Sequence, residues 1–287
     1  MEEVKKVGII GVGLLGGSIG LALKARSRDI HVLGMGRTKA KLDKAIQYKA
    51  IDSYDLSYKN GVQDCDLVII ATPVATIVPI FQQIHPHLKE DAVVTDVGST
   101  KVSICKAIEE DSQFRHFFVG SHPMAGSENT GVEAARADLY LNSTVVIIEN
   151  SCHGDRINRV ESFWRSLEAK TVKMTADQHD RLTAYTSHLP HIVATCLSYT
   201  LSQALTDEDL KAKVFGNGLV DTTRIAEGDP KIWLDILITN KDHLLASVKD
   251  FQSALSRLEG LVQDMDSHGI TEYLKKGKDF REEIMND

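Results

Sequence analysis

The chain has 287 residues, of which 43% are hydrophobic and 25% charged, and its formal net charge is -7. This length is too great for one minimal core and suits one large domain or two of ordinary size. The negative charge, without a basic cluster, argues against nucleic acid or an anionic membrane as a partner. No window approaches ~18 uncharged apolar residues, and the N-terminus "MEEVKKVGIIGVG" does not resemble a signal peptide. We therefore expect no membrane span and a cytoplasmic location.

Four cysteines lie at positions 65, 105, 152 and 196, without a C-x-x-C pair or the spacing of a zinc site. The sequence therefore predicts no metal site. Buried, reduced thiols of a cytosolic protein are the expected state of these side chains.

Short apolar runs alternate with helix-length segments over the first 175 residues. The runs occupy residues 5–11, 30–36, 66–73, 92–99, 116–123, 143–150 and 170–174. This alternation indicates right-handed βαβ crossovers and a mostly parallel sheet. Because the runs are continuously apolar, we expect helices on both faces of the sheet. Residues 1–175 are thus predicted to form a Rossmann-like, doubly wound domain.

The pattern becomes helical after Met174, and Thr175 with Gln178 forms a predicted capping box at the first helix. Pro190 lies inside this pattern, and we expect it to lose the bond to the carbonyl of Thr186 and kink the helix. Residues 176–287 are predicted to form an all-helical domain. A few amphipathic helices bury little surface alone, so this domain is also expected to form a homodimer.

A glycine-rich loop, "GVGLLG" (residues 11–16), directly follows a predicted strand and opens a predicted helix. Gly11 permits a tight turn, Gly13 lets a pyrophosphate approach the backbone, and Gly16 lets the helix pack closely on the strand. Leu14 and Leu15 begin the helix whose N–H groups would face the phosphates. The loop predicts a dinucleotide site, with a glycine-rich turn that binds nothing as the alternative.

The end of the second strand reads "GMGRTK" (residues 34–39) and contains no carboxylate. NAD enzymes place an acidic residue there, about 20 residues after the glycine loop, to bind the ribose hydroxyls. Gly36 leaves room, and Arg37 with Thr38 or Lys39 is suited to hold a 2′-phosphate. We therefore predict NADP as the preferred cofactor over NAD. The alternative is that Arg37 stacks on the adenine while either cofactor binds.

Polar residues follow three of the predicted strands, at the edge of the sheet where ligands bind. They are Thr72-Pro73, "DVGS" ending in Ser99, and Ser121-His122. Thr72 and Pro73 are predicted to contact the cofactor, and Ser99 and His122 to share a substrate hydroxyl. His122 as a structural residue bonded to backbone and Ser99 as the N-cap of the following helix are the alternatives.

Lys101 also follows one of these strand ends, two residues after Ser99. It pairs either with Asp96 or with a substrate anion, and the sequence does not rank the two.

Five segments between residues 7 and 233 carry a family resemblance, in the family's order and spacing. They are "GIIGVGLLGGSIGLALK", "VVTDVGSTK", "FVGSHPMAGSE", "ADQHDRLTAYTSHLPHIVA" and "DTTRIAEGDPKIW". The chain resembles the prephenate/arogenate dehydrogenases of tyrosine biosynthesis, and "HPMAGSE" together with "SHLPH" is specific to them. The resemblance implies an NAD(P)-dependent oxidative decarboxylation, in which hydride leaves C4 of a cyclohexadienol ring. Carbon dioxide leaves C1 as the ring becomes aromatic.

The resemblance also implies roles for individual residues. The family's catalytic base matches His122, and Ser99 matches its partner at the same hydroxyl. A neutral imidazole is needed, which suits an unperturbed pKa near ~6.5. The substrate is a dianion, so we expect positive charge from His188 and His191, one helical turn apart in the segment that lines the family's pocket.

Arg224 matches the family's carboxylate-binding arginine, since a bidentate guanidinium fits a carboxylate, and Trp233 matches a pocket aromatic. A surface arginine and a core tryptophan are the alternatives. Val220 stands in "GLVDTTRIA" where the family usually shows an arginine, "GFRDTTRIA", which puts a second guanidinium contact in doubt.

The expected partners are a small-molecule substrate and a second copy of the chain. Prephenate is favoured as the substrate, with arogenate as the alternative. A β-hydroxyacid-type dehydrogenase has a similar layout but uses a lysine of the helical domain, where this chain offers His188 and His191. A non-catalytic NADP sensor would not need His122, Ser99 and Arg224 near one edge.

Overall fold

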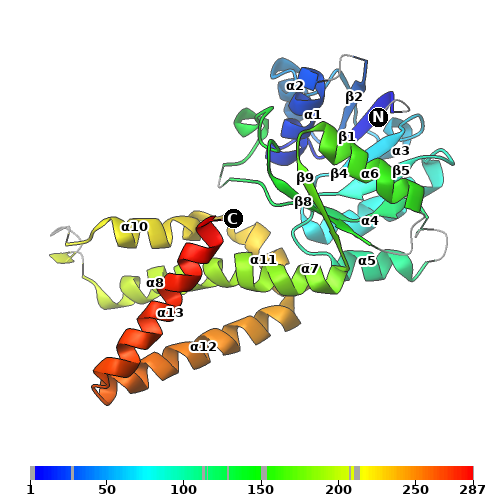
Figure 1. Ribbon diagram of the computed structural model, residues 1–287. Helices are drawn as coiled ribbons and strands as arrows, with labels where there is room; N and C mark the ends of the chain where they lie inside the picture. The colour runs from blue at the N-terminus through cyan, green and yellow to red at the C-terminus, as the bar shows by residue number, and fades with distance from the viewer. Residues whose placement is uncertain are drawn as a thin grey trace. The chain divides into compact units, whose positions relative to one another are not determined.

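The structure is a computed structural model, shown in Figure 1. It describes residues 4–26, 29–111, 114, 116–127, 129–149, 154–206, 208–209 and 214–286. The chain forms two compact units, one ending at Asn240 and the other beginning at Lys241. The division into functional domains at residues 175 and 176 stays a prediction.

The first unit contains a six-stranded parallel sheet in the order β3-β2-β1-β4-β5-β6. Its strands are β1 (Lys6–Ile10), β2 (His31–Met35), β3 (Ser53–Asp55), β4 (Leu67–Ile70), β5 (Val93–Asp96) and β6 (Phe118–Val119). The connecting helices are α1 (Leu14–Arg26), α2 (Lys39–Gln47), α3 (Tyr58–Gly61), α4 (Val74–Ile84) and α5 (Val102–Glu109). The order reverses between β1 and β4, which makes the crevice beyond these strands the expected ligand site. The Rossmann-like prediction is confirmed.

Helices cover both faces of this sheet (Figure 1), as the continuous apolar strands predict. Ile9 and Ile10 are both fully buried, in two different clusters, because neighbouring strand residues point to opposite faces. One cluster packs the sheet against α1, α2 and α6 (Gly154–Ser166), and the other packs it against α4 and α5.

A second, three-stranded sheet contains β7 (Ser121–Pro123), β8 (Thr144–Ile148) and β9 (Lys170–Met174). β7 pairs antiparallel with β8, and β8 pairs parallel with β9. The run 116–123, expected as one strand, is therefore split at Gly120 into β6 and β7. His122 belongs to the second sheet, opposite Val146, and not to the parallel one. β3 escaped prediction because "SYD" is short and half-exposed.

The helices that complete the first unit follow β9, as expected. They are α7 (Ala176–Thr183), a π-helical turn (Ala184–His188), α8 (Leu189–Ala204), α10 (Asn217–Thr223), a 3-10 turn (Arg224–Glu227) and α11 (Pro230–Thr239). The capping box is confirmed, since Thr175 Oγ1 accepts from Gln178 N and Gln178 Oε1 accepts from Thr175 N. Pro190 lies in the first turn of α8, where a missing N–H costs little. A π-helical turn directly precedes α8.

The second unit consists of α12 (Lys241–Gln263) and α13 (Ser267–Asn286), and the hydroxyl of Tyr273 donates to the carbonyl of Ala254. Large apolar side chains are exposed along both helices; Leu255 is 57% exposed and Phe280 62%. Within the described residues, no helix has the length and apolar character needed to cross a membrane.

The cysteines only partly follow the expectation of buried thiols. Cys65 and Cys105 are free and buried, but Cys196 is free and exposed on α8, so that part of the expectation is wrong. Cys152 lies outside the described residues.

Candidate active site

The glycine loop has the geometry that a dinucleotide requires. Gly11 has a φ of +92°, and a Cβ there would lie 2.6 Å from the carbonyl oxygen of Ala71. A Cβ on Gly16 would overlap the carbonyl oxygen of Gly11, so the close approach of α1 depends on this glycine. A Cβ on Gly13 would meet no atom within 4 Å, which leaves this backbone open to a pyrophosphate at the N-terminus of α1. The loop therefore fits a dinucleotide.

The candidate 2′-phosphate ligands at the end of β2 differ in the contacts that their side chains make. Arg37 and Thr38 are exposed, and Thr38 is the N-cap of α2 without using its side chain to cap it. Lys39, in contrast, is paired with Asp43 at 2.9 Å, and the hydroxyl of Tyr54 donates to the same carboxylate. Arg37 and Thr38 thus remain the available groups beside Gly36.

A cavity of about 540 Å³ lies where the glycine loop, the ends of β4 and β5, β7 and the later helices meet. It brings together predicted residues from distant parts of the chain. They are Gly13, Leu14, Leu15, Thr72, Pro73, Ser99, His122, His188 and Trp233. A neighbouring cavity of about 420 Å³ shares Trp233 and is lined by His191 and Arg224. Gly11, Gly16, Gly36, Arg37 and Thr38 line neither cavity.

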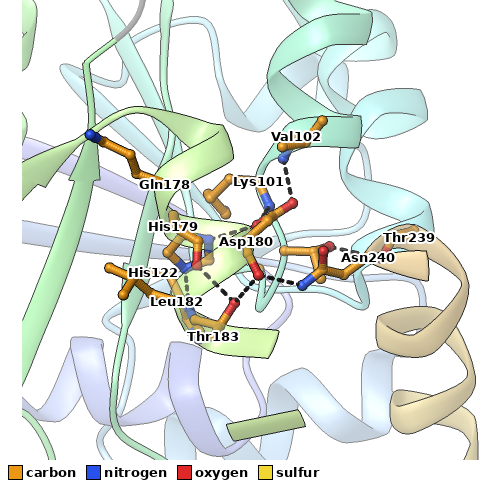
Figure 2. Close-up of polar contacts among 12 residues, drawn as sticks. Lys101, Val102, His122, Gln178, His179, Asp180, Leu182, Thr183, Thr239 and Asn240 are labelled. Atoms are coloured by element: carbon orange, nitrogen blue, oxygen red, sulfur yellow. Dashed lines mark hydrogen bonds and ion pairs between the residues drawn. The ribbon is translucent and has the colours of Figure 1, made fainter. Parts of the chain in front are cut away.

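His122 lines the larger cavity and belongs to a chain of three side chains (Figure 2). Its Nδ1 lies 2.8 Å from Nε2 of His179, whose Nδ1 lies 2.7 Å from Oδ1 of Asp180. A carboxylate only accepts, so His179 donates from Nδ1. In neutral His179, Nε2 then carries no proton and accepts the proton of His122 Nδ1. Nε2 of His122 is therefore the unprotonated nitrogen, as a base requires.

The pKa of His122 is well below its usual value of 6.5. Burial is the largest cause, followed by the nearby His179, Lys101 and His188. The expectation of an unperturbed pKa is therefore wrong, because the surroundings of the ring disfavour its charged form. The imidazole stays neutral throughout the physiological pH range.

Asp180 also caps the helix that follows Ser99. Its carboxylate accepts from the backbone N of Lys101 at 2.7 Å and of Val102 at 2.8 Å (Figure 2). The alternative role of Ser99 as the N-cap is therefore wrong, since α5 begins only at Val102. Ser99 instead lines the cavity with His122.

Lys101 and Asp96 form a fully buried ion pair. Of the two alternatives for Lys101, the pairing with Asp96 is therefore the one observed. The ammonium of Lys101 also donates to the carbonyl of Ser121 at 2.9 Å, and Asp96 accepts from the backbone N of Ser121 at 3.1 Å. This cluster fixes the backbone immediately before His122.

His188 ends the π-helical turn and is 1% exposed. Its Nδ1 lies 3.2 Å from Nδ2 of Asn240, and that amide nitrogen donates to the carbonyl of Asp180 at 2.7 Å. Burial, the largest cause, lowers the pKa of His188 to about 4. His188 is therefore uncharged at neutral pH, contrary to the expectation that it supplies positive charge.

His191 stacks on Trp233, with ring centroids 3.4 Å apart and an interplanar angle of 14°. Burial lowers the pKa of His191, so it does not supply positive charge either. A Cβ on Gly228 would overlap the indole nitrogen of Trp233, so a glycine is needed against this stack. The exposed Arg224 is the cation that lines the smaller cavity, and Val220 is 52% exposed.

Three residues of this arrangement were not predicted from the sequence: His179, Asp180 and Asn240. The adjacent His-Asp pair, one turn into a helix with a clear capping box, is the only local feature that hints at the first two. Among the described residues, no group of three or more metal-ligating side chains could hold a metal ion. Glu128, the last residue of "HPMAGSE", lies outside the described part of the chain.

Two family models match the chain in succession. Residues 19–173 match the nucleotide-binding domain of prephenate dehydrogenase, and residues 175–276 match the dimerization domain of prephenate dehydrogenase.

Individual proteins agree with these models. Prephenate dehydrogenase of Bacillus subtilis is 32% identical over 285 residues, which cover 98% of this chain and 77% of the relative. A crystal structure of prephenate dehydrogenase from Aquifex aeolicus, in complex with hydroxyphenyl propionate and NAD+, has a TM-score of 0.92 at 32% identity. It covers 98% of this chain and 99% of its own. The crystal structure of Synechocystis arogenate dehydrogenase has a TM-score of 0.83 at 26% identity, and the match covers 97% of this chain and 99% of that one. The chain, an oxidoreductase, belongs to the prephenate dehydrogenase family.

Proposed function

We propose that this chain catalyses the NAD(P)-dependent oxidative decarboxylation of prephenate to 4-hydroxyphenylpyruvate and carbon dioxide. The observation that carries the proposal is the His122–His179–Asp180 chain, which presents an unprotonated imidazole nitrogen in a cavity that also contains the glycine loop. A base and a hydride acceptor would thus meet at one substrate carbon.

The cofactor, when bound, supplies the acceptor for the hydride that leaves C4 of the ring. Nε2 of His122 takes the proton of the C4 hydroxyl, and Ser99 contacts the same oxygen. His179 holds the His122 ring through Nδ1, and the negative charge of Asp180 favours the imidazolium that forms. The C1 carboxylate leaves as carbon dioxide because its loss completes the aromatic ring.

Substrate binding is assigned to groups of both cavities. Arg224 is proposed to bind a substrate carboxylate through its guanidinium fork. His188, His191 and Trp233 are proposed to form the pocket around the ring and its side chain. Replacing Arg224 with Gln is expected to raise KM far more than it lowers kcat, and an unchanged KM would contradict its role.

Arogenate is the second candidate substrate, supported by the likeness to Synechocystis arogenate dehydrogenase. The experiment mixes the protein and NADP+ with prephenate or with arogenate in parallel and follows absorbance of the reduced nicotinamide. A higher kcat/KM with prephenate supports the proposal, and a higher value with arogenate replaces it. If neither substrate is turned over, a β-hydroxyacid-type dehydrogenase and an NADP sensor are the remaining candidate functions. No lysine of the described chain lines either cavity, which disfavours the β-hydroxyacid type.

NADP is proposed as the preferred cofactor, with NAD as the alternative. Support comes from the exposed Arg37 and Thr38 at the end of β2 and from the absence of a carboxylate in residues 34–39. The ratio of kcat/KM for NADP+ over NAD+ is expected to exceed one. Replacing Arg37 with Gln should lower the NADP+ value about 10- to 100-fold and spare NAD+.

A homodimer is proposed through the predicted helical domain, residues 176–287. The match to a dimerization domain over residues 175–276 and the exposed apolar side chains of α12 and α13 support it. Residues 1–175 are proposed as the dinucleotide-binding domain and the cytoplasm as the location. Sedimentation of the purified chain tests the dimer, and a monomer at micromolar concentration would contradict it.

A further inference from the structure

Asp180 has a second contact that leads to the other histidine of the larger cavity. Its backbone carbonyl accepts a hydrogen bond of 2.7 Å from the side-chain amide of Asn240, the C-cap residue of α11 (Figure 2). Both partners are buried. A carbonyl oxygen only accepts, so the amide must present its nitrogen, and this contact fixes the orientation of the Asn240 side chain.

The same amide nitrogen lies 3.2 Å from Nδ1 of His188. An amide nitrogen only donates, and its second proton is free for this contact. Nδ1 of His188 must therefore accept, which leaves the proton of the neutral ring on Nε2.

We propose that Asn240 is a positioning residue that holds His188 as a neutral hydrogen-bond donor, with its proton on Nε2, in the larger cavity. Asp180 thereby determines the tautomers of both His122 and His188, and the two tautomers are opposite. Its side chain acts through His179 and makes His122 an acceptor, whereas its carbonyl acts through Asn240 and makes His188 a donor.

The paired tautomers have a chemical use. A base must accept the hydroxyl proton, while a second group must donate to another oxygen of the substrate without competing for that proton. A neutral donor does this without adding charge beside His122. His188 is therefore assigned to an oxygen acceptor of the substrate, either a carboxylate or a carbonyl. This assignment rests on the proposed function, but the tautomer does not.

The surroundings of His188 keep it in this state. Its ring lies edge-on to Trp233, with ring centroids 6.1 Å apart. The titratable groups around it are Asp180, His179, His191 and His122. Burial lowers its pKa to about 4, which outweighs the attraction of Asp180 for a proton. A donor that stays neutral over the physiological range is thus built from contacts within the first unit.

The tautomer is tested by nitrogen-15 NMR of the full-length protein, labelled on its histidines and free of substrate, with His188→Gln used for assignment. We expect a protonated Nε2 and an unprotonated Nδ1 at neutral pH. The opposite tautomer, or a cationic ring, would overturn the proposal whatever reaction the enzyme performs.

Asn240→Asp tests the positioning role because it changes the amide to a carboxylate of nearly the same size. The carboxylate accepts, so the proton of His188 should move to Nδ1, and KM for the substrate should rise about 10- to 100-fold with a smaller change in kcat. Thr239→Val is the matched control. Thr239 lies next to Asn240 at the end of α11, and its hydroxyl forms a hydrogen bond of 2.8 Å with the hydroxyl of Thr100 and does not contact His188. Thr239→Val should keep the wild-type tautomer of His188. If Asn240→Asp also keeps the wild-type tautomer and the wild-type KM, the proposal is overturned.

A pair of His188 variants tests the donor itself. Gln places an N–H near the position of Nε2, whereas Asn places one near Nδ1 and leaves the cavity without a donor. His188→Asn should show the same rise in KM of about 10- to 100-fold, and His188→Gln should show a smaller rise because it keeps a donor. Equal KM values for the two variants would overturn the role of His188. If the expected tautomer is found but neither prephenate nor arogenate is oxidised, the proposed function fails and the tautomer assignment stands.

Discussion

A single imidazole nitrogen carries the proposed chemistry, and its state is determined by residues far away in the chain. His122 contacts His179, 57 residues later, and His179 in turn contacts the neighbouring Asp180. The sequence singled out His122 because it follows a strand. It could not show the contact with His179, because that contact exists only after α7 packs beside β7.

His122→Asn removes the base but keeps a polar side chain of similar size. We expect kcat to fall about 10²- to 10⁴-fold, the usual contribution of a general base, with a smaller change in KM. Steady-state kinetics with prephenate and NADP+ measures this. Cofactor affinity, followed by fluorescence titration, should be unchanged and serves as the control. Turnover near the wild-type value would remove His122 from the mechanism.

The pH dependence of kcat follows from the lowered pKa of His122. A base must be unprotonated, and this ring gains a proton only well below its usual pKa of 6.5. We therefore expect kcat to be level from pH 8 down through 6.5 and to decline only in more acidic buffer. A pH–rate profile measures it. A decline centred on 6.5 would mean that the ring titrates as if it were in water.

Elements defined by local patterns were predictable from the sequence. The glycine loop and the Thr175–Gln178 capping box depend on residues within a few positions of one another, and both are confirmed as local structure. The start of α5 was not predictable, because its cap comes from Asp180, 78 and 79 residues away. β7 was joined to β6 for a similar reason, since only its pairing with β8 separates the two.

Two glycines of one loop should respond differently to the same substitution. A methyl on Gly13 meets no atom, so Gly13→Ala should leave the melting temperature unchanged while it raises the cofactor Kd at least about 10-fold by blocking the pyrophosphate. A methyl on Gly16 overlaps the carbonyl of Gly11, so Gly16→Ala should lower both stability and affinity. Thermal unfolding without cofactor and cofactor titration measure these effects. Unchanged cofactor affinity in Gly13→Ala would contradict the proposed path of the phosphates.

At the scale of the whole molecule, two neutral histidines with lowered pKa values, His122 and His188, make the folded state sensitive to acid. Above pH 6.5 they are neutral in both the folded and unfolded states and contribute no pH dependence. Below pH 6.5, His122 and His188 bind protons in the unfolded chain but stay neutral in the folded protein. The free energy of unfolding therefore falls as the pH falls.

The expected loss is about 1.4 kcal/mol per pH unit for each histidine, and for His188 it extends from 6.5 down to about 4. Urea unfolding at several pH values between 7.5 and 4.5 measures the slope. His188→Gln, which cannot titrate, should show a shallower slope than the wild type. Equal slopes would mean that His188 is protonated in the folded protein.

The stack of His191 on Trp233 gives the protein a built-in optical reporter. The chain has two tryptophans, and Trp164 is fully buried between α6 and the sheet, away from solvent. Trp233 borders both cavities and is half-buried. Any molecule that enters either cavity changes the polarity around its indole. Occupancy can therefore be followed by intrinsic fluorescence, without a dye and before any turnover occurs.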